Sequence, residues 1–212
     1  MAKAWASLDR LSGGRALPAF GLGVADGAEQ AAFGVARKER APRFDELLPQ
    51  VRQLWAGEEV GGVTIAPRPV QEPLEVWLGG RAPSELRRVG RLGDGWLPSF
   101  CTPEDVAAGR PAVEAEAAAH DRCIDPEHWG ALLPYLAEEG PLPDLLAAAV
   151  AARRPGGYPA QVVPAGLPAL RSAVEAFVAV GVSKFVLVPV VEPDDWDRHL
   201  SGVATATLDL VT

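Results

Sequence analysis

The segment from residue 74 to residue 96, LEVWLGGRAPSELRRVGRLGDGW, constrains the fold of this chain more than any other. Its apolar start, 74–78, is typical of a buried strand that ends at Gly79-Gly80. Pro83 suits the first turn of a helix for two reasons. Its ring fixes φ near the helical value, and the N–H group that proline lacks would have no hydrogen-bond partner within the helix at that position. A glycine-rich turn, GDG, then leads into another apolar stretch. The segment therefore predicts a strand, a tight turn, a helix and a second strand, which is the repeat of an α/β fold.

The turn at Gly79-Gly80 is also a candidate binding element. Two glycines let backbone N–H groups approach a ligand closely, and the start of the following helix carries partial positive charge suited to phosphate. Arg81 adds a formal cation beside the turn. The same glycines would equally serve any tight turn between a strand and a helix, so the residues alone leave both interpretations open.

Apolar periodicity predicts the other strands and helices. We expect strands at 17–25, 74–78, 96–98, 129–136 and 184–191, helices at 1–11, 44–55, 83–92, 103–122, 142–154, 167–180 and 194–210, and a polar loop over 26–41. Pro49 predicts a kink or a late start near Asp45 in the second helix. Thr102 is expected to cap the helix that follows it, with Asp105 at the third helical position.

The strands are apolar along their whole length, which predicts a parallel sheet buried on both faces by helices. A closed (β/α) barrel has eight strand–helix units in about 250 residues. This chain supplies about five units, so we expect an α/β fold of the partial TIM type, with about five parallel strands, forming a single domain over 1–212.

Composition excludes several classes of partner. The formal net charge of -8 disfavours nucleic acid and anionic membrane surfaces. No apolar run reaches the length of about 18 residues that a spanning helix needs, and the N-terminal residues lack the zones of a signal peptide, so a cytoplasmic location is expected. The two cysteines, Cys101 and Cys123, have no metal-type spacing and are expected to be reduced thiols. We expect no metal site.

Several motifs in the same order resemble luciferase-like flavin and deazaflavin monooxygenases, and most of all their coenzyme F420-dependent oxidoreductases. These motifs are LDRLSGGR at 8–15, GLGV at 21–24, FGVARKERAPRFDELLPQVRQLW at 33–55, WLGGRAPSELRRVGRLGDGW at 77–96 and GVSKFVLVPV at 181–190. The resemblance covers nearly the whole chain and implies the fourth to eighth strands of the family's barrel, incomplete at the N-terminus. Since the family's first three strands usually carry the groups that transfer protons, the resemblance assigns no catalytic acid or base here.

The resemblance implies a cofactor, F420 or FMN, and six cofactor-binding positions: Gly79, Gly80, Arg81, Ser84, Gly23 and Val24. The glycine pair would contact the cofactor phosphate through the main chain, with the arginine and serine beside it as further donors. The other two positions, at the end of the first expected strand, would lie near the ring or its linker. Relatives often carry an arginine in the last strand where this chain has Val188, which puts an anionic group there in doubt.

Other candidate groups have simpler structural interpretations. The glycines of 21–27 miss the spacing of a dinucleotide fingerprint. His120 and His199 fall in polar helical stretches and are expected on the solvated surface, while His128 would precede a strand at its amino end. The acidic residues of 192–197 are expected to cap the last helix. Trp77 and Trp96 are expected in the core or in a pocket wall.

The leading hypothesis is therefore an oxidoreductase that moves a hydride between a small organic substrate and a flavin or deazaflavin. One alternative is a noncatalytic flavin-binding or assembly remnant of the same family. Another is a chain that starts late, at an internal methionine of a longer enzyme, and whether this chain is active alone stays open. Because open sheet edges are unfavourable unless covered, we expect a homo-oligomer or a partner chain over them.

Overall fold

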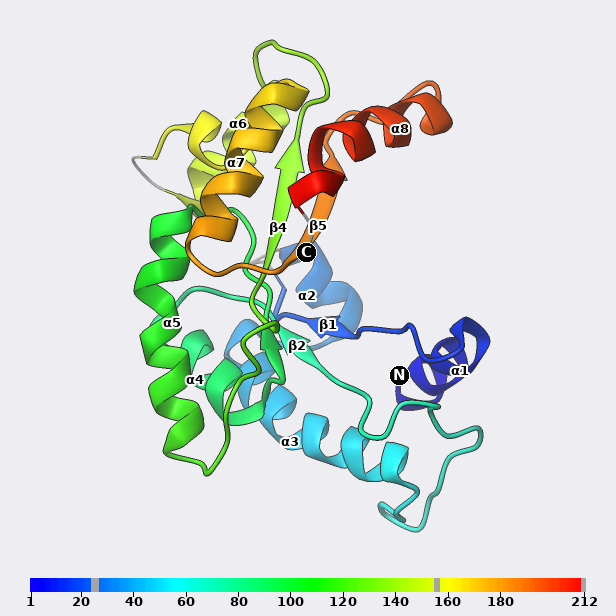
Figure 1. Cartoon of the computed structure of the whole chain (residues 1–212). Coiled ribbons are helices and arrows are strands. Elements are labelled where there is room, and N and C mark those ends of the chain that lie inside the picture. The colour runs from blue at the N-terminus through cyan, green and yellow to red at the C-terminus, as the bar shows by residue number, and fades with distance from the viewer. Residues whose placement is uncertain (24–26, 155–156, 211–212) are drawn as a thin grey trace. The chain divides into compact units, whose positions relative to one another are not determined.

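The computed structural model describes residues 1–23, 27–154 and 157–210. Within these residues the chain is α/β with parallel strands (Figure 1). The elements are α1 (Ala2–Ser12), β1 (Ala19–Phe20), α2 (Gly27–Phe33), α3 (Arg37–Ala56), β2 (Trp77–Leu78), α4 (Pro83–Leu92), β3 (Gly95–Trp96), α5 (Pro103–Ala118), β4 (Gly130–Tyr135), α6 (Asp144–Arg153), η1 (Pro159–Gln161), α7 (Leu167–Ala179), β5 (Lys184–Pro189), α8 (Trp196–Thr207) and η2 (Leu208–Leu210).

The chain divides into two compact units. The first contains Met1–Gly95 and Val113–Cys123, and the second contains Trp96–Ala112 and Ile124–Thr212. The expectation of a single domain over the whole chain stays a prediction.

The first unit is built on the parallel pair β1 and β2. Ala19 pairs with Trp77 and Phe20 with Leu78, and the sheet order is β1-β2-β3. Both strands are shorter than their apolar runs predict. Strand β2 is buried, with Trp77 only 1% exposed, whereas Ala19 of β1 is exposed and Phe20 is partly buried, so the expectation of a buried first strand is wrong. Helix α4 has the predicted bounds and packs on β2.

The expectation of a polar loop over 26–41 is wrong for most of the described residues in that range. Helix α2 occupies part of it, and α3 already begins at Arg37. The early start has a local cause: the backbone N–H of Ala36 donates to the Glu39 carboxylate at 3.1 Å, and the Glu39 N–H donates to the Ala36 carbonyl at 2.9 Å. The late start expected from Pro49 is also wrong, because α3 runs from Arg37 to Ala56 with Pro42 and Pro49 inside it.

The second unit contains the longer parallel pair, β4 and β5. Their register runs from Gly130–Lys184 to Tyr135–Pro189, and Figure 1 shows the two strands side by side. Helices α7 and α8 contact each other, and Phe177 of α7 meets Phe185 of β5 edge to face at 6.4 Å. The strand from 129 to 136 and the helix from 167 to 180 are thus confirmed within a residue or two.

Strand β5 is not buried on both faces, so the sequence expectation is wrong there. Its residues alternate, with Val186 43% and Val188 37% exposed while Phe185 and Leu187 are partly buried. The cause is that helices cover one face only, and within the described residues β5 pairs with β4 alone.

The predicted helix caps are present. The Thr102 N–H donates to the Asp105 carboxylate at 2.9 Å, and the Asp105 N–H donates to the Thr102 hydroxyl at 3.3 Å. At α8 the carboxylate of Asp195 accepts from the N–H of Arg198 at 3.0 Å, as expected for the acidic stretch that precedes this helix.

Candidate functional site

The carboxyl ends of β1 and β2 bring together two glycine segments that are far apart in sequence. The N–H of Gly79 donates to the carbonyl of Phe20 at 2.8 Å, which continues the strand pairing by one step. Gly21 and Gly23 follow β1 at the same edge where Gly80 follows β2. Ligands of α/β folds bind at this edge of the sheet. Val24, the last expected cofactor position, lies outside the described residues.

The turn after β2 requires glycine. Gly80 has φ +103°, and a Cβ atom there would come within 2.6 Å of the Glu85 side chain. The Glu85 carboxylate accepts the N–H groups of Arg81 and Ala82, both at 2.9 Å. The carboxylate therefore occupies amides at the start of α4 that an anion could otherwise use.

The resemblance implies that the backbone amides of this turn contact phosphate, but groups of the chain itself already accept hydrogen bonds from some of these amides. The Gly79 amide is bonded to Phe20, and the Arg81 amide to Glu85. Ser84 is exposed at the first turn of α4. What the turn offers is close approach to its backbone, because two consecutive residues carry no side chain.

A cavity of about 380 Å³ lies beside Gly23 in the first unit. The loop after β1 forms one wall, and α2 and the first half of α3 form the others. Its lining residues are Gly21, Leu22, Gly23, Phe33, Val35, Arg40, Arg43, Phe44 and Leu47. The cavity therefore combines two guanidinium groups with aliphatic and aromatic walls.

The two arginines of this cavity are positioned by α3. Arg40 and Arg43 are one helical turn apart and share a face with Phe44. The Arg40 side chain donates to the Leu22 carbonyl at 3.1 Å and so holds the loop after β1. Phe44 stacks edge to face with Phe20, with centroids 6.3 Å apart. Arg40 and Arg43 were not predicted as site residues from the sequence, although positions 40, 43, 44 and 47 follow helical spacing.

Asp94, in the GDG turn, anchors the strand that carries the glycine pair. Its carboxylate accepts hydrogen bonds from the Val76 N–H at 2.8 Å, from Arg52 at 2.5 Å and from Arg122 at 2.9 Å. The Asp94 N–H in turn donates to the Val76 carbonyl at 2.8 Å. These contacts fix β2 at its amino end, just before the strand reaches Trp77 and Leu78 and then the turn.

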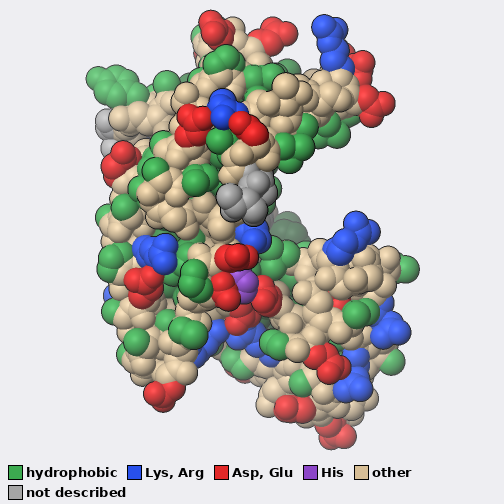
Figure 2. Space-filling model, in the orientation of Figure 1, with side chains coloured by type: hydrophobic (Ala, Val, Ile, Leu, Met, Phe, Trp, Pro, Cys, Tyr) green, Lys and Arg blue, Asp and Glu red, His purple; other side chains and the backbone are tan. Residues whose placement is uncertain are grey.

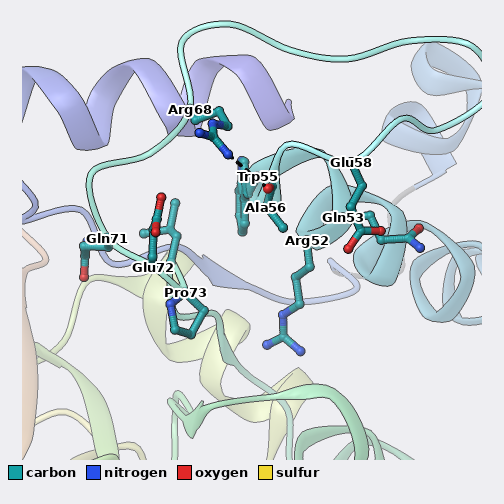
Figure 3. Close-up of a pocket in the computed structure, with 10 residues that line it drawn as sticks. Arg52, Gln53, Trp55, Ala56, Glu58, Arg68, Gln71, Glu72 and Pro73 are labelled. Carbon is teal, nitrogen blue, oxygen red and sulfur yellow. Dashed lines mark hydrogen bonds between the residues drawn. The ribbon is translucent and has the colours of Figure 1, made fainter.

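Another cavity of the first unit, about 450 Å³, lies at the amino end of β2 (Figure 3). It is bordered by the last turns of α3 and by the segment from 68 to 74. Figure 3 shows Arg68 directed toward Ala56, whose carbonyl accepts its hydrogen bond at 3.2 Å. In folds of this type chemistry takes place at the opposite, carboxyl edge of the strands. The cavity beside Gly23 is therefore the better candidate.

The second unit has its own cavity, about 730 Å³, at the carboxyl ends of β4 and β5. Arg198 and His199 of α8 line it together with a set of acidic residues, namely Glu138, Glu139, Glu192, Asp194 and Asp195. No group of three or more His, Cys, Asp or Glu side chains within the described ranges is placed to hold a metal ion.

The expectation of a solvated His199 is wrong. This side chain is partly buried, and its Nε2 lies 2.6 Å from the hydroxyl of Tyr135, whose ring stacks on the imidazole. The cause is that α8 turns this residue toward the end of β4. Burial raises the pKa of Tyr135, so its hydroxyl stays protonated at neutral pH. His120 is exposed beside Glu116 as expected, and His128 precedes β4.

Charged side chains of both signs lie on the visible surface of the described residues. On the face shown in Figure 2, the Lys and Arg side chains of the described residues are scattered among acidic ones rather than gathered in one area. Among those residues no helix has both the length and the hydrophobicity that crossing a membrane requires.

Comparison with known proteins gives one family and two groups of relatives. The family described as luciferase-like monooxygenase matches residues 1–140. A phthiodiolone/phenolphthiodiolone dimycocerosates ketoreductase of Mycobacterium tuberculosis is 31% identical over 141 residues, which cover 59% of this chain and 35% of the relative. An F420-dependent glucose-6-phosphate dehydrogenase of Beutenbergia cavernae is 30% identical over 168 residues, which cover 62% of this chain and 49% of the relative. The chain thus spans less than half the length of these curated relatives.

A solved structure shares the fold. The coenzyme F420-dependent tetrahydromethanopterin reductase of Methanopyrus kandleri superposes with a TM-score of 0.73 at 18% identity. The match covers 100% of this chain and 78% of the reductase.

Proposed function

Because this chain belongs to the luciferase-like monooxygenase family, we propose that it is a flavin- or deazaflavin-dependent oxidoreductase acting on a small organic substrate. The names of its relatives support F420 as the cofactor, and the family supports FMN as the other choice. When bound, such a cofactor supplies the hydride chemistry, and the residues of this chain bind and orient it.

We also propose that the five strands correspond to the fourth to eighth strands of a TIM-type barrel. Parallel pairing in both units and the fold shared with the F420-dependent reductase support this assignment. In such a barrel, the carboxyl ends of the strands carry the binding site.

The observation that carries the site is the edge shared by β1 and β2. Gly23, Gly79, Gly80, Arg81 and Ser84 gather there, and we propose that they contact the cofactor. The fit is supported by the pairing of β1 with β2, which brings the glycines that follow both strands to one edge of the sheet. Val24 is proposed as a sixth contact on the resemblance alone.

The alternative function is a noncatalytic flavin-binding or assembly remnant. Within the described residues β5 pairs with β4 alone and exposes Val186 and Val188. Both features support self-association or a partner chain in either case, because an unpaired apolar strand edge is unfavourable unless covered. Cofactor binding is common to both functions, and turnover separates them.

The test is a titration of the whole chain with F420 and with FMN, followed by cofactor fluorescence. We expect saturable binding of at least one cofactor below about 100 μM. No change with either cofactor would contradict both functions. If binding occurs, oxidation or reduction of the bound cofactor by a panel of alcohols, aldehydes and ketones supports the enzyme, and inertness toward the whole panel supports the remnant.

A further inference from the structure

We propose that the cavity at the carboxyl ends of β4 and β5 binds small organic molecules that carry a carbonyl or hydroxyl oxygen and no negative charge, and that His199 donates the hydrogen bond that holds this oxygen. The site lies within the second unit. The inference goes beyond the proposed function, because it concerns a pocket that needs no bound cofactor. Neither Tyr135 nor His199 is among the positions that the resemblance implies.

The hydrogen bond between Tyr135 and His199 decides which nitrogen of the imidazole carries the proton. Tyr135 is only 2% exposed, and Nε2 of His199 is the one hydrogen-bond partner of its hydroxyl among the described residues. If Nε2 donated, the buried hydroxyl would hold a proton without an acceptor, which is costly. Tyr135 therefore donates, and the Nε2 atom of a neutral His199 accepts.

The second ring nitrogen of His199 is then a hydrogen-bond donor that faces no protein acceptor. In a neutral imidazole whose Nε2 accepts, the proton lies on Nδ1. Nδ1 has no hydrogen-bond partner in the described part of the chain, and it is not among the buried atoms closed off from solvent. Because His199 lines the cavity, this donor is available to a ligand there.

The imidazole is also held in place before any ligand binds. The Tyr135 ring stacks on it with centroids 5.8 Å apart and an interplanar angle of 17°, and Trp196 meets it edge to face at 5.8 Å. A donor on a ring that is already ordered loses little conformational entropy when it binds an acceptor. Tyr135 acts here as a positioning residue.

The walls of the cavity suit the carbon skeleton of an organic molecule. Its volume of about 730 Å³ falls in the range of small-molecule sites. Leu136 follows β4, Val191 follows β5, and Leu167 begins α7, so apolar side chains from three segments line it. The carboxyl edge of parallel strands is also where α/β folds bind ligands.

The charges of the lining select against anions. Arg198 is outnumbered by five exposed carboxylates, those of Glu138, Glu139, Glu192, Asp194 and Asp195. A negatively charged molecule meets like charge there, whereas a neutral one does not and a cation is attracted. Solvent and salt screen these exposed groups, so they set a charge preference and the hydrogen bond from His199 supplies the recognition.

NMR of the histidine ring nitrogens tests the direction of the hydrogen bond. The chain has three histidines, so substituting each in turn assigns their signals. At about pH 8.5, where an ordinary imidazole is neutral, we expect the His199 proton on Nδ1. Tyr135→Phe should move it toward Nε2 and leave the signals of His120 unchanged. A proton on Nε2 of His199 in the wild-type chain would overturn the inference.

Binding is tested with three ketones that share one skeleton and differ in charge: acetophenone, 4-acetylbenzylamine and 4-acetylbenzoate. The backbone amide signal of Gly202, which lines the cavity, reports binding in every variant. We expect saturable shifts with the neutral and the cationic ketone, with dissociation constants below about 10 mM for molecules of this size. The benzoate should bind at least about fivefold more weakly than the amine at low salt.

His199→Phe keeps a flat ring and removes the donor. It should weaken acetophenone about fivefold, in the range of one lost hydrogen bond. His120→Phe is the matched control, because it makes the same change at an exposed histidine outside the cavity, and it should change this affinity by less than about twofold. Thermal unfolding of each variant shows whether the fold is intact.

Two further results would overturn the inference. One is the absence of any shift at Gly202 and His199 with all three ketones up to about 20 mM. The other is an unchanged acetophenone affinity in His199→Phe, since the donor would then lie elsewhere. These measurements use the whole chain without cofactor. A failure to bind F420 or FMN would therefore contradict the proposed function and leave this inference standing.

Discussion

At the scale of single residues, Asp9 is a buried charge that stabilises the first unit. It is fully buried, and its carboxylate accepts the N–H groups of Val70 at 2.6 Å and Gln71 at 2.9 Å together with the Gln71 side-chain amide at 2.7 Å. Burial alone would raise the pKa of Asp9, but the hydrogen bonds from Gln71 and Val70 outweigh burial and lower it. The ionised carboxylate therefore stabilises the folded chain.

Substitution of Asp9 by Asn should lower the free energy of unfolding by about 1–3 kcal/mol at pH 7, because two backbone donors lose a charged acceptor. The folded pKa lies below the unfolded value of about 3.9, so this stabilisation is complete above that pH and is lost as the pH falls through the folded pKa. Urea unfolding at pH 7 and at steps down to about pH 2 should show the variant and the wild type converging.

Glu46→Gln on the exposed side of α3 is the control for Asp9, with an expected change within about 0.5 kcal/mol at all pH values. A constant difference between Asp9→Asn and the wild type across the pH range would show that the carboxylate's charge is not what stabilises this site. Only the structure could reveal this residue, since its partners are 61 and 62 positions away.

For the candidate site as well, local signals could be found in the sequence and contacts between distant residues could not. Gly79 and Gly80 could be proposed from the sequence because glycine pairs between a strand and a helix are a local signal. It did not show Arg40 and Arg43, because a stretch rich in charge resembles a loop until the cap formed by Ala36 and Glu39 starts the helix. Nor could it show that Glu85 uses the amides at the start of α4.

At the scale of elements, the bounds of a helix could be predicted where the residues at its two ends carry a local signal. Helix α4 has the predicted bounds because Pro83 and the following acidic residue fix its start and Gly93 ends it. Strands β1 and β2 are only two residues long despite longer apolar runs, since hydrophobicity marks burial and not hydrogen bonding to a neighbour. Pairing depends on distant segments, which no local pattern contains.

Two helical glycines should respond oppositely to alanine. A Cβ atom on Gly90 of α4 would come within 2.5 Å of the Val113 carbonyl and 2.8 Å of the Ala117 amide of α5. Because backbone atoms cannot yield cheaply, Gly90→Ala should cost about 1–3 kcal/mol of unfolding free energy, even though alanine favours helices. On Gly202 of α8 the nearest atom is Leu167 Cδ1 at 3.4 Å, so Gly202→Ala should be neutral or stabilising by up to about 1 kcal/mol.

Urea denaturation of both variants measures these free energies. Each substitution serves as the control for the other, since both change glycine to alanine inside a helix. Equal effects of one sign would show that helix propensity, rather than the close approach of α4 and α5, decides the outcome.

At the scale of the whole molecule, β5 has an exposed face and an unpaired edge among the described residues. Val186 and Val188 point away from α7, and β4 is the only strand paired with β5 in the described part of the chain. Such an edge offers both unpaired backbone groups and apolar side chains to a neighbour. Our proposal of self-association or a partner chain depends on this face.

The double substitution Val186→Ser and Val188→Ser should therefore weaken association. Sedimentation velocity over a range of concentrations should show that the wild-type chain forms oligomers in a concentration-dependent way. The variant should have a dissociation constant about tenfold higher or more, as expected when two valine side chains lose burial.

The control is the double substitution Val63→Ser with Val178→Ser. It removes two valines of similar exposure elsewhere, 57% and 42%, and should leave the equilibrium unchanged. If both double variants shift alike, association depends on general hydrophobicity. If the wild type is monomeric at all concentrations and no partner copurifies with it, the face of β5 is not an interface, and the exposed valines reflect only the alternation of a half-covered strand.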